Sequence, residues 1–204
     1  VVLLRSFDRP GPLPAGPAGG VPLALSLGFF LSGVAALVYQ VVWQRLLVLH
    51  SGVGIYSVAL IVSAFMAGLG LGSWLGGRLS LRLDERRALL AFAALELGLA
   101  GLGAASSWLY YDLVRGLPPP ASLWEAGLVH CLALLPPTTL MGMSLPFLAR
   151  AVVLDSRTAG RRLGALYALN VLGAALGAAL APWVLMRLYG LRGATWAAAG
   201  ANLA

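Results

Sequence analysis

The sequence of 204 residues contains no lysine and a single cysteine, and only 10% of its residues are charged. One cysteine excludes a disulfide framework and a cysteine-rich metal site. The low charge excludes an ordinary soluble domain, in which about 25% of residues are charged. By contrast, 60% of the residues are hydrophobic and the mean hydropathy is +0.88. This composition predicts a multi-pass membrane protein and excludes a disordered chain.

Five apolar segments, each long enough to cross about 30 Å of hydrocarbon, lie between charged connections. They cover residues 23–43, 55–77, 88–110, 123–148 and 163–186, and a sixth, over 193–204, is incomplete. We therefore predict an all-α bundle of about six membrane-spanning helices over 23–204, preceded by a Pro- and Gly-rich lead-in over 1–22. The first residue, Val1, and the short last segment indicate a longer natural polypeptide.

The net charge of +7 arises from 14 arginines against 7 acidic residues. Because the arginines lie between apolar segments, the lipid bilayer and not nucleic acid is the expected partner. Ten arginines fall in the lead-in and in the second and fourth connections, and four fall elsewhere. The positive-inside rule then places the N-terminus and the even-numbered connections in the cytoplasm. We expect a multi-pass protein of the bacterial cytoplasmic (inner) membrane.

Glycines recur at every fourth position in two of the apolar segments. They are Gly68, Gly72 and Gly76 in the second segment, and Gly173 and Gly177 in the fifth. This spacing places small residues on one helix face, where another backbone can approach closely. The second segment also contains the letters GxGxG of a nucleotide-binding loop. Such a loop needs free backbone N–H groups, which a membrane helix has already bonded, so we interpret the glycines as helix-packing residues.

The stretch LLPPTTLMGMSLP at 134–146 contains three prolines within an apolar segment. Proline removes a helical N–H and leaves the carbonyl four residues earlier without its donor. We expect a break at Pro136, Pro137, Thr138 and Thr139, where the threonines, with Ser144, satisfy the freed carbonyls. Two interpretations stay open: a kinked helix that wraps its neighbours, or a broken helix that lines a polar cavity.

Four polar residues form the candidate intramembrane site: Gln40, Glu96, His130 and Asn170. A buried carboxyl group is costly in a membrane, so Glu96 is a functional candidate, with a neutral acid that joins two helices as the alternative. Interhelical hydrogen bonds are the expected role of Gln40 and Asn170. His130 has no second ligand at metal-binding spacing, so we expect no metal site. No catalytic motif occurs in the chain, and no catalytic residue is assigned.

Three stretches of the chain together resemble one family. They are FLSGVAALVYQVVWQR at 30–45, FMAGLGLGSWLGGR at 65–78, and LPPTTLMGMSLPFLAR at 135–150 with LGALYALNVLGAALG at 163–177. These stretches resemble the membrane region of bacterial spermidine-synthase-like proteins, the fused major-facilitator/spermidine synthases. A weaker resemblance, to the major-facilitator loop between helices two and three, lies in GGRLSLRLDERR at 76–87.

The resemblance implies a cytosolic aminopropyltransferase domain after residue 204, with decarboxylated S-adenosylmethionine as co-substrate and a diamine such as putrescine as acceptor. None of that chemistry lies in these residues, so no cofactor is expected in this chain, which would anchor or regulate the catalytic domain. One alternative is half of a transporter for polyamines or another small cation, with Glu96, Gln40 and Asn170 facing a cavity beside the proline break. Another is a non-catalytic subunit that packs into a homo-oligomer or a larger membrane complex.

Overall fold

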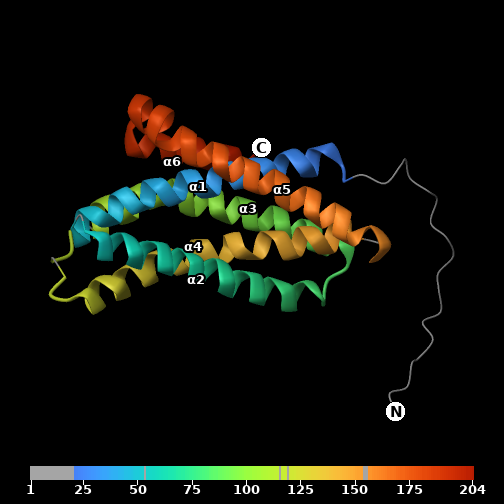
Figure 1. Ribbon diagram of the computed structural model, residues 1–204, viewed down its shortest axis with the longest axis horizontal. Coiled ribbons are helices and arrows are strands. Elements are labelled where there is room, and N and C mark those ends of the chain that lie inside the picture. Colours follow the sequence, from blue (N-terminus) through green and yellow to red (C-terminus); the bar gives the residue numbers. More distant parts are fainter. Residues whose placement is uncertain (1–20, 53, 115, 119, 154–155) are drawn as a thin grey trace, which may run out of the picture.

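The computed structural model describes residues 21–52, 54–114, 116–118, 120–153 and 156–204, and all regular elements in these ranges are helical (Figure 1). The expected lead-in falls almost entirely outside them. Five helical stretches of the described chain are long and apolar enough to cross a membrane, which confirms an all-α, membrane-type fold. The elements are α1 (Leu23–Ser51), α2 (Ile55–Ser80), α3 (Glu85–Trp108), η1 (Leu109–Val114), α4 (Leu123–Val152), α5 (Ser156–Leu180), η2 (Ala181–Leu185) and α6 (Met186–Asn202).

The starts of α3 and α4 are fixed by side chains that satisfy free backbone N–H groups. Before α3, the Asp84 carboxylate accepts a hydrogen bond of 2.8 Å from Arg87 N. Before α4, the Ser122 hydroxyl accepts from Glu125 N at 3.2 Å, while the Glu125 carboxylate accepts from Ala121 N at 2.7 Å. Such caps satisfy N–H groups that have no intrahelical partner. Each of the two helices thus begins beside a polar residue, and the two starts lie at opposite ends of the bundle (Figure 1).

The fifth and sixth predicted segments are joined by a turn at Gly190, without an intervening loop. Gly190 has φ of 67° and ψ of −174°, a backbone conformation that is essentially reserved for glycine. After it, α6 runs antiparallel to η1 and α3: Arg192 contacts Asp112, Thr195 contacts Ser107, and Asn202 contacts Glu96. The partners Asp112, Ser107 and Glu96 lie progressively earlier along η1 and α3. The turn therefore returns the chain to the middle of the bundle (Figure 1).

Two helix pairs pack through glycine. In the α2–α4 pair, a Cβ atom added at Gly72 would overlap the Thr139 carbonyl and the Gly142 backbone. In the α1–α5 pair, a Cβ at Gly177 would overlap the Val34 carbonyl. We call these contacts the glycine seams; their glycines are Gly68, Gly72, Gly76 and Gly142 in the α2–α4 seam, and Gly33, Gly173 and Gly177 in the α1–α5 seam. Backbones can approach this closely where a helix face carries small residues.

The helix break expected at Pro136, Pro137, Thr138 and Thr139 is absent, because α4 continues without interruption through all three of its prolines. Neighbouring helices bond two of the carbonyls that these prolines free. The Tyr110 hydroxyl donates to Ala133 O at 2.6 Å, four residues before Pro137. The Ser73 hydroxyl donates to Gly142 O at 3.2 Å, four residues before Pro146. Donors from other helices can thus replace the missing N–H groups and keep a proline-containing helix intact.

The helix contacts keep the same pattern when α1, α2 and α3 are exchanged with α4, α5 and α6. The α2 helix packs on α4 as α5 packs on α1, and α3 packs on α4 as α6 packs on α1. In addition, α3 and α6 pack on each other. Because α1 and α4 run in opposite directions along the bundle (Figure 1), the two units have opposite topology. Exchanging the two units therefore keeps the contacts and reverses the direction of the helices.

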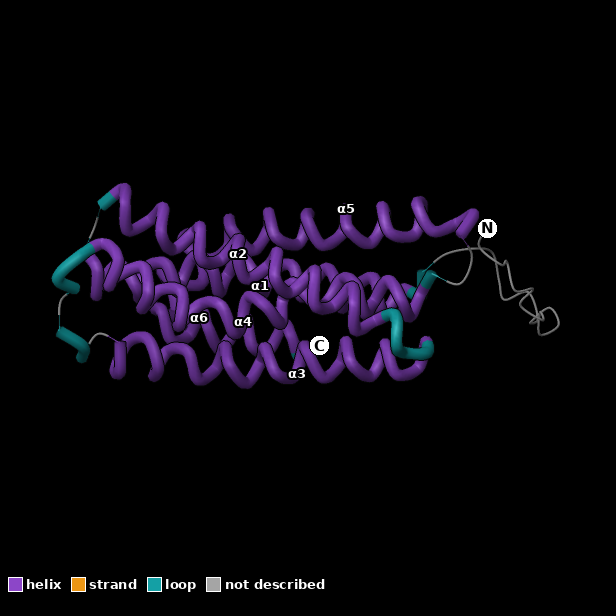
Figure 2. The backbone as a smooth tube through the Cα atoms, turned by 90° about the horizontal axis from the view of Figure 1, so that it is seen from below, coloured by secondary structure: helices purple, strands orange, loops and turns teal. Residues whose placement is uncertain are grey.

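The two ends of the bundle differ in their side chains. The α2–α3 and α4–α5 connections lie at the end where α1 begins (Figures 1 and 2). Arginines flank these connections: Arg78, Arg82, Arg86, Arg87, Arg150, Arg157, Arg161 and Arg162. At the opposite end, several large aromatic residues are exposed: Tyr56, Trp108, Trp124 and Tyr189. The bundle therefore has one arginine-rich end and one end with exposed aromatic side chains.

Candidate polar centre

Glu96 lies where four helices meet, and each of the other three supplies a polar side chain to it. The Ser32 hydroxyl of α1 donates to Glu96 Oε1 at 2.9 Å, and the Ser144 hydroxyl of α4 donates to the same oxygen at 3.3 Å. The Asn202 amide of α6 donates to Glu96 Oε2. We call Ser32, Glu96, Ser144 and Asn202 the polar centre. Glu96 is 7% exposed and Asn202 9% exposed, so the centre is buried.

The polar centre lies on the contact surfaces of the two inverted units. Its side chains come from α1, α3, α4 and α6. When the two units are exchanged, α1 takes the place of α4 and α3 takes the place of α6, so the same four helices surround the centre. On α3, Glu96 occupies the buried face with Phe92, Leu99 and Gly103, which are spaced three or four residues apart. This spacing directs the carboxylate into the bundle and away from the exposed face. The helical repeat of α3 therefore positions the acid.

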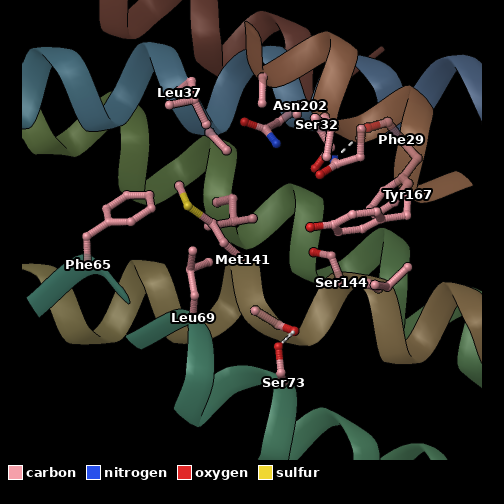
Figure 3. Close-up of a pocket in the computed structure, with 18 residues that line it drawn as sticks. Phe29, Ser32, Leu37, Phe65, Leu69, Ser73, Met141, Ser144, Tyr167 and Asn202 are labelled. Atoms are coloured by element: carbon pink, nitrogen blue, oxygen red, sulfur yellow. Dashed lines mark hydrogen bonds between the residues drawn. The ribbon is translucent and has the colours of Figure 1, made fainter. Parts of the chain in front are cut away.

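A cavity of about 250 Å³ borders the polar centre. Figure 3 shows Ser32, Ser144 and Asn202 around one part of it, with Leu37, Phe65 and Leu69 around another. The polar lining residues come from five helices, α1, α2, α4, α5 and α6: Ser32, Ser73, Ser144, Tyr167, Asn170 and Asn202. Most other lining residues are apolar. The cavity thus combines a polar wall with an apolar one.

Within the cavity wall, the serine protons are already used by the protein, whereas each asparagine amide has a second N–H and Tyr167 has a hydroxyl. Each of the three serine hydroxyls donates its one proton: Ser32 and Ser144 to Glu96, and Ser73 to Gly142 O. The Asn170 amide donates to Phe29 O at 3.0 Å, and the Asn202 amide donates to Glu96. A hydroxyl that has donated its proton offers only lone pairs to another group. The polar wall therefore offers acceptors at its serines and donors at its asparagines and Tyr167.

The structure brings together two of the four residues that the sequence predicted as an intramembrane site. Glu96 forms the polar centre, and Asn170 lines the adjoining cavity. Gln40 and His130, both in the described part of the chain, do not line this cavity. Sequence reasoning assigned no site role to Ser32 or Asn202 and assigned Ser144 to a proline-freed carbonyl, whereas its hydroxyl donates to Glu96. The sequence signal for these three residues was weak, because serine and asparagine are common in membrane helices and their role depends on which residues lie next to them in the fold.

Metal-ligating side chains do not gather within the ranges that the structure describes: no group of three or more His, Cys, Asp or Glu residues there could hold a metal ion. Comparisons of the chain with family models, with curated proteins and with solved structures found no match in any of the three.

Proposed function

We propose that this chain is the membrane module of a spermidine-synthase-like protein, and that it anchors or regulates a cytosolic aminopropyltransferase domain. The observation that carries the proposal is the location of the residues that give the family resemblance, which lie at contacts between helices. Tyr39 and Trp43 of YQVVW are 0% and 1% exposed and stack with ring centroids 5.0 Å apart. In PTTLMG, Thr138 and Gly142 face α2 across a glycine seam. Signature residues at helix contacts fit a rigid scaffold that carries another domain.

The two ends of the bundle support an orientation for this module. Arginines in short connections favour the cytoplasmic side, and exposed tryptophan and tyrosine favour a membrane–water interface. We therefore propose that the arginine-rich end faces the cytoplasm of a bacterium and that the protein resides in the inner membrane. After Gly190, α6 runs towards this same end. A domain that follows α6 would lie on the side where a diamine and decarboxylated S-adenosylmethionine are available.

The test is the intact mass of the polypeptide purified from its native membrane. A module joined to a catalytic domain should exceed the 21.1 kDa of this chain by a whole domain, on the order of 100–200 residues. The purified protein should then transfer an aminopropyl group from decarboxylated S-adenosylmethionine to putrescine. A mass near 21.1 kDa would contradict the proposal and favour a stand-alone packing subunit or small transporter.

A second candidate function is half of a major-facilitator-type transporter for a small cation such as a polyamine. The helix contacts favour it, because their pattern is kept when α1, α2 and α3 are exchanged with α4, α5 and α6. Inverted repeats with a central site are a transporter architecture. Asn170 lines the central cavity and Glu96 bonds Ser32 and Ser144 of its wall, although Gln40 does not line it and α4 is unbroken. The test is uptake of labelled putrescine into proteoliposomes. Uptake that survives Glu96→Gln unchanged would count against this candidate.

A further inference from the structure

We propose that the outer face of α2, at the arginine-rich end of the bundle, binds the headgroup of an anionic phospholipid, with Arg78 as the ligand to the lipid phosphate. This binding activity goes beyond the anchoring role, and it holds whether or not a catalytic domain follows the module. Three features of this face carry the proposal: the position of Arg78 beside Trp74, the hydrogen-bonding state of its guanidinium group, and the charge of its surroundings.

Trp74 and Arg78 lie on the side of α2 that faces away from the α2–α4 seam. Each follows a seam glycine, Gly72 or Gly76, by two residues, which is a rotation of about 200° around an α-helix. Trp74 is 52% exposed, and Arg78 is also exposed. Because α2 has the length and composition of a membrane span, this side faces lipid. Arg78 lies just before the last residue of α2, Ser80, at the end of the bundle where α1 begins (Figures 1 and 2), so it lies at the depth of the lipid headgroups.

The Arg78 guanidinium group is oriented by the indole ring of Trp74. Arg78 Cζ lies 3.9 Å from the ring centroid. Arginine stacks on an aromatic face through the flat side of its guanidinium group, so the N–H donors in the guanidinium plane stay available. Among the described residues, none forms an ion pair or a hydrogen bond with the Arg78 side chain. The group thus offers a fixed fork of donors, the arrangement that binds a phosphate through two hydrogen bonds.

Other arginines at this end are bonded within the protein. Three of them donate to protein acceptors: Arg87 to the Asp84 carboxylate, Arg150 to Leu83 O and Arg162 to Val152 O. Arg78 differs from these three because it has an aromatic support and no protein acceptor in the described part of the chain. An acceptor from outside the chain would complete its hydrogen bonds.

The charge around Arg78 favours a lipid with a net negative charge. The α2 helix contains no acidic residue, and Arg82 follows Arg78 by four residues. Of the next two acids in the chain, Asp84 pairs with Arg87 at 3.5 Å and Glu85 belongs to the first turn of α3. A zwitterionic headgroup would bring its own positive charge to this end of α2, where the helix has no acid to balance it. In phosphatidylglycerol the phosphate carries an uncharged glycerol, so this headgroup matches the charge of the site.

The apolar surface beside the pair distinguishes a lipid from a free phosphate ion. Leu71, three residues before Trp74, is exposed on the same side of α2. At Gly70, an added Cβ would meet nothing within 4 Å, so the surface there is open. An acyl chain that extends from the bound phosphate towards the middle of the membrane would lie along these residues and make van der Waals contact with them. A free phosphate ion would make none of these contacts.

The first test compares lipids that have the same acyl chains and different headgroups. The purified protein in dodecyl maltoside is titrated with dioleoyl phosphatidylglycerol or dioleoyl phosphatidylethanolamine, and bound lipid is measured by native mass spectrometry and by the shift in thermal unfolding. We expect phosphatidylglycerol to bind about fivefold more tightly, the size of effect that one arginine has near an anionic surface. Equal affinities would overturn the proposal. Sodium phosphate should stabilise the protein no more than NaCl of the same ionic strength, and stabilisation equal to that by phosphatidylglycerol would overturn the proposal in favour of a free-phosphate site.

The second test uses matched variants at the two ends of the bundle. Trp183 and Arg187 repeat the spacing of this pair near the Gly190 turn, and both are exposed. Unlike Arg78, however, Arg187 has no cation–π contact with a described residue. Arg78→Gln should abolish the preference for phosphatidylglycerol, whereas Arg187→Gln should keep it. An equal loss in both variants, or no loss in Arg78→Gln, would contradict a site at Arg78.

A third variant separates the charge of Arg78 from the geometry of its guanidinium group. Arg78→Lys keeps the charge but not the planar fork, so it should bind phosphatidylglycerol less tightly than the wild type and more tightly than Arg78→Gln. Binding as tight as that of the wild type would overturn the role of the guanidinium group. None of these readouts depends on aminopropyltransferase activity, so failure of the proposed function and failure of this inference can be told apart.

Discussion

The glycine seams and the polar centre hold the same bundle together by opposite means. In the seams, backbones approach so closely that one added carbon atom overlaps a carbonyl of the next helix. In the polar centre, side chains span the distance between helices and meet at one carboxylate. The seams tolerate no added volume, whereas the centre tolerates no lost acceptor. The comparison shows two ways of joining membrane helices: close backbone packing at the seams and shared hydrogen bonds to one side chain at the centre.

The largest effect should come from adding volume to a seam. In Gly72→Ala, the new methyl group would overlap the Thr139 carbonyl and the Gly142 backbone, neither of which can move like a flexible side chain. Overpacking of this kind costs about 1–3 kcal/mol, and we expect the upper end. Gly70→Ala is the matched control on the same helix, since a Cβ there meets nothing within 4 Å. Thermal unfolding of the two variants in the same detergent measures the difference, and equal midpoints would refute the seam.

A somewhat smaller loss should follow removal of the acceptor from the polar centre. Glu96→Ala leaves the Ser32, Ser144 and Asn202 donors without their common partner. Unsatisfied buried donors cost about 1–3 kcal/mol, and rotation of the serine hydroxyls should keep the sum near about 2 kcal/mol. Glu96→Gln retains a carbonyl acceptor and should lose less stability. A Gln variant as unstable as the Ala variant would mean that charge, and not acceptor capacity, holds the centre together.

The turn that brings Asn202 to the polar centre offers a third comparison. Gly190 has a φ of 67°, which L-residues rarely adopt, so Gly190→Ala should lower the free energy of unfolding by about 1–2 kcal/mol. Gly200→Ala, on the same helix in open space, is the control and should be neutral. The measurement is again the thermal midpoint. Cysteine cross-linking of Glu96→Cys with Asn202→Cys, in a background without Cys131, would report whether α6 still returns to α3.

The smallest effect should come from the hydroxyl that supports the proline-containing helix. Tyr110→Phe removes the hydrogen bond to Ala133 O and should cost about 1 kcal/mol. Pro137→Ala restores a backbone N–H to that carbonyl, so Tyr110→Phe should cost less in the Pro137→Ala background. A double-mutant cycle isolates this coupling. Additive effects would show that Tyr110 stabilises α4 in some other way.

Much of the fold could be predicted from the sequence because apolar length and helical spacing are local properties. The first four helices begin within three residues of the predicted segments, and α1 extends beyond its predicted end at 43 to Ser51. The extension contains Arg45, whose charge suggested an end to the apolar segment. The uninterrupted course of α4 could not be predicted, since it depends on donors from Ser73 and Tyr110, which lie 69 and 23 residues away from the carbonyls that they bond.

The helical class, the membrane-length segments, and the small-residue faces of α2 and α5 follow from the sequence alone, since composition and a repeat of 3.6 residues are sufficient for these. The sequence also singled out Glu96, because an acid is rare in such a segment. The hydroxyls and the amide that surround Glu96 are known only from the packing of the helices. Ser32, Ser144 and Asn202 are 64, 48 and 106 residues from it in the chain, and only the crossing of four helices brings them to one carboxylate.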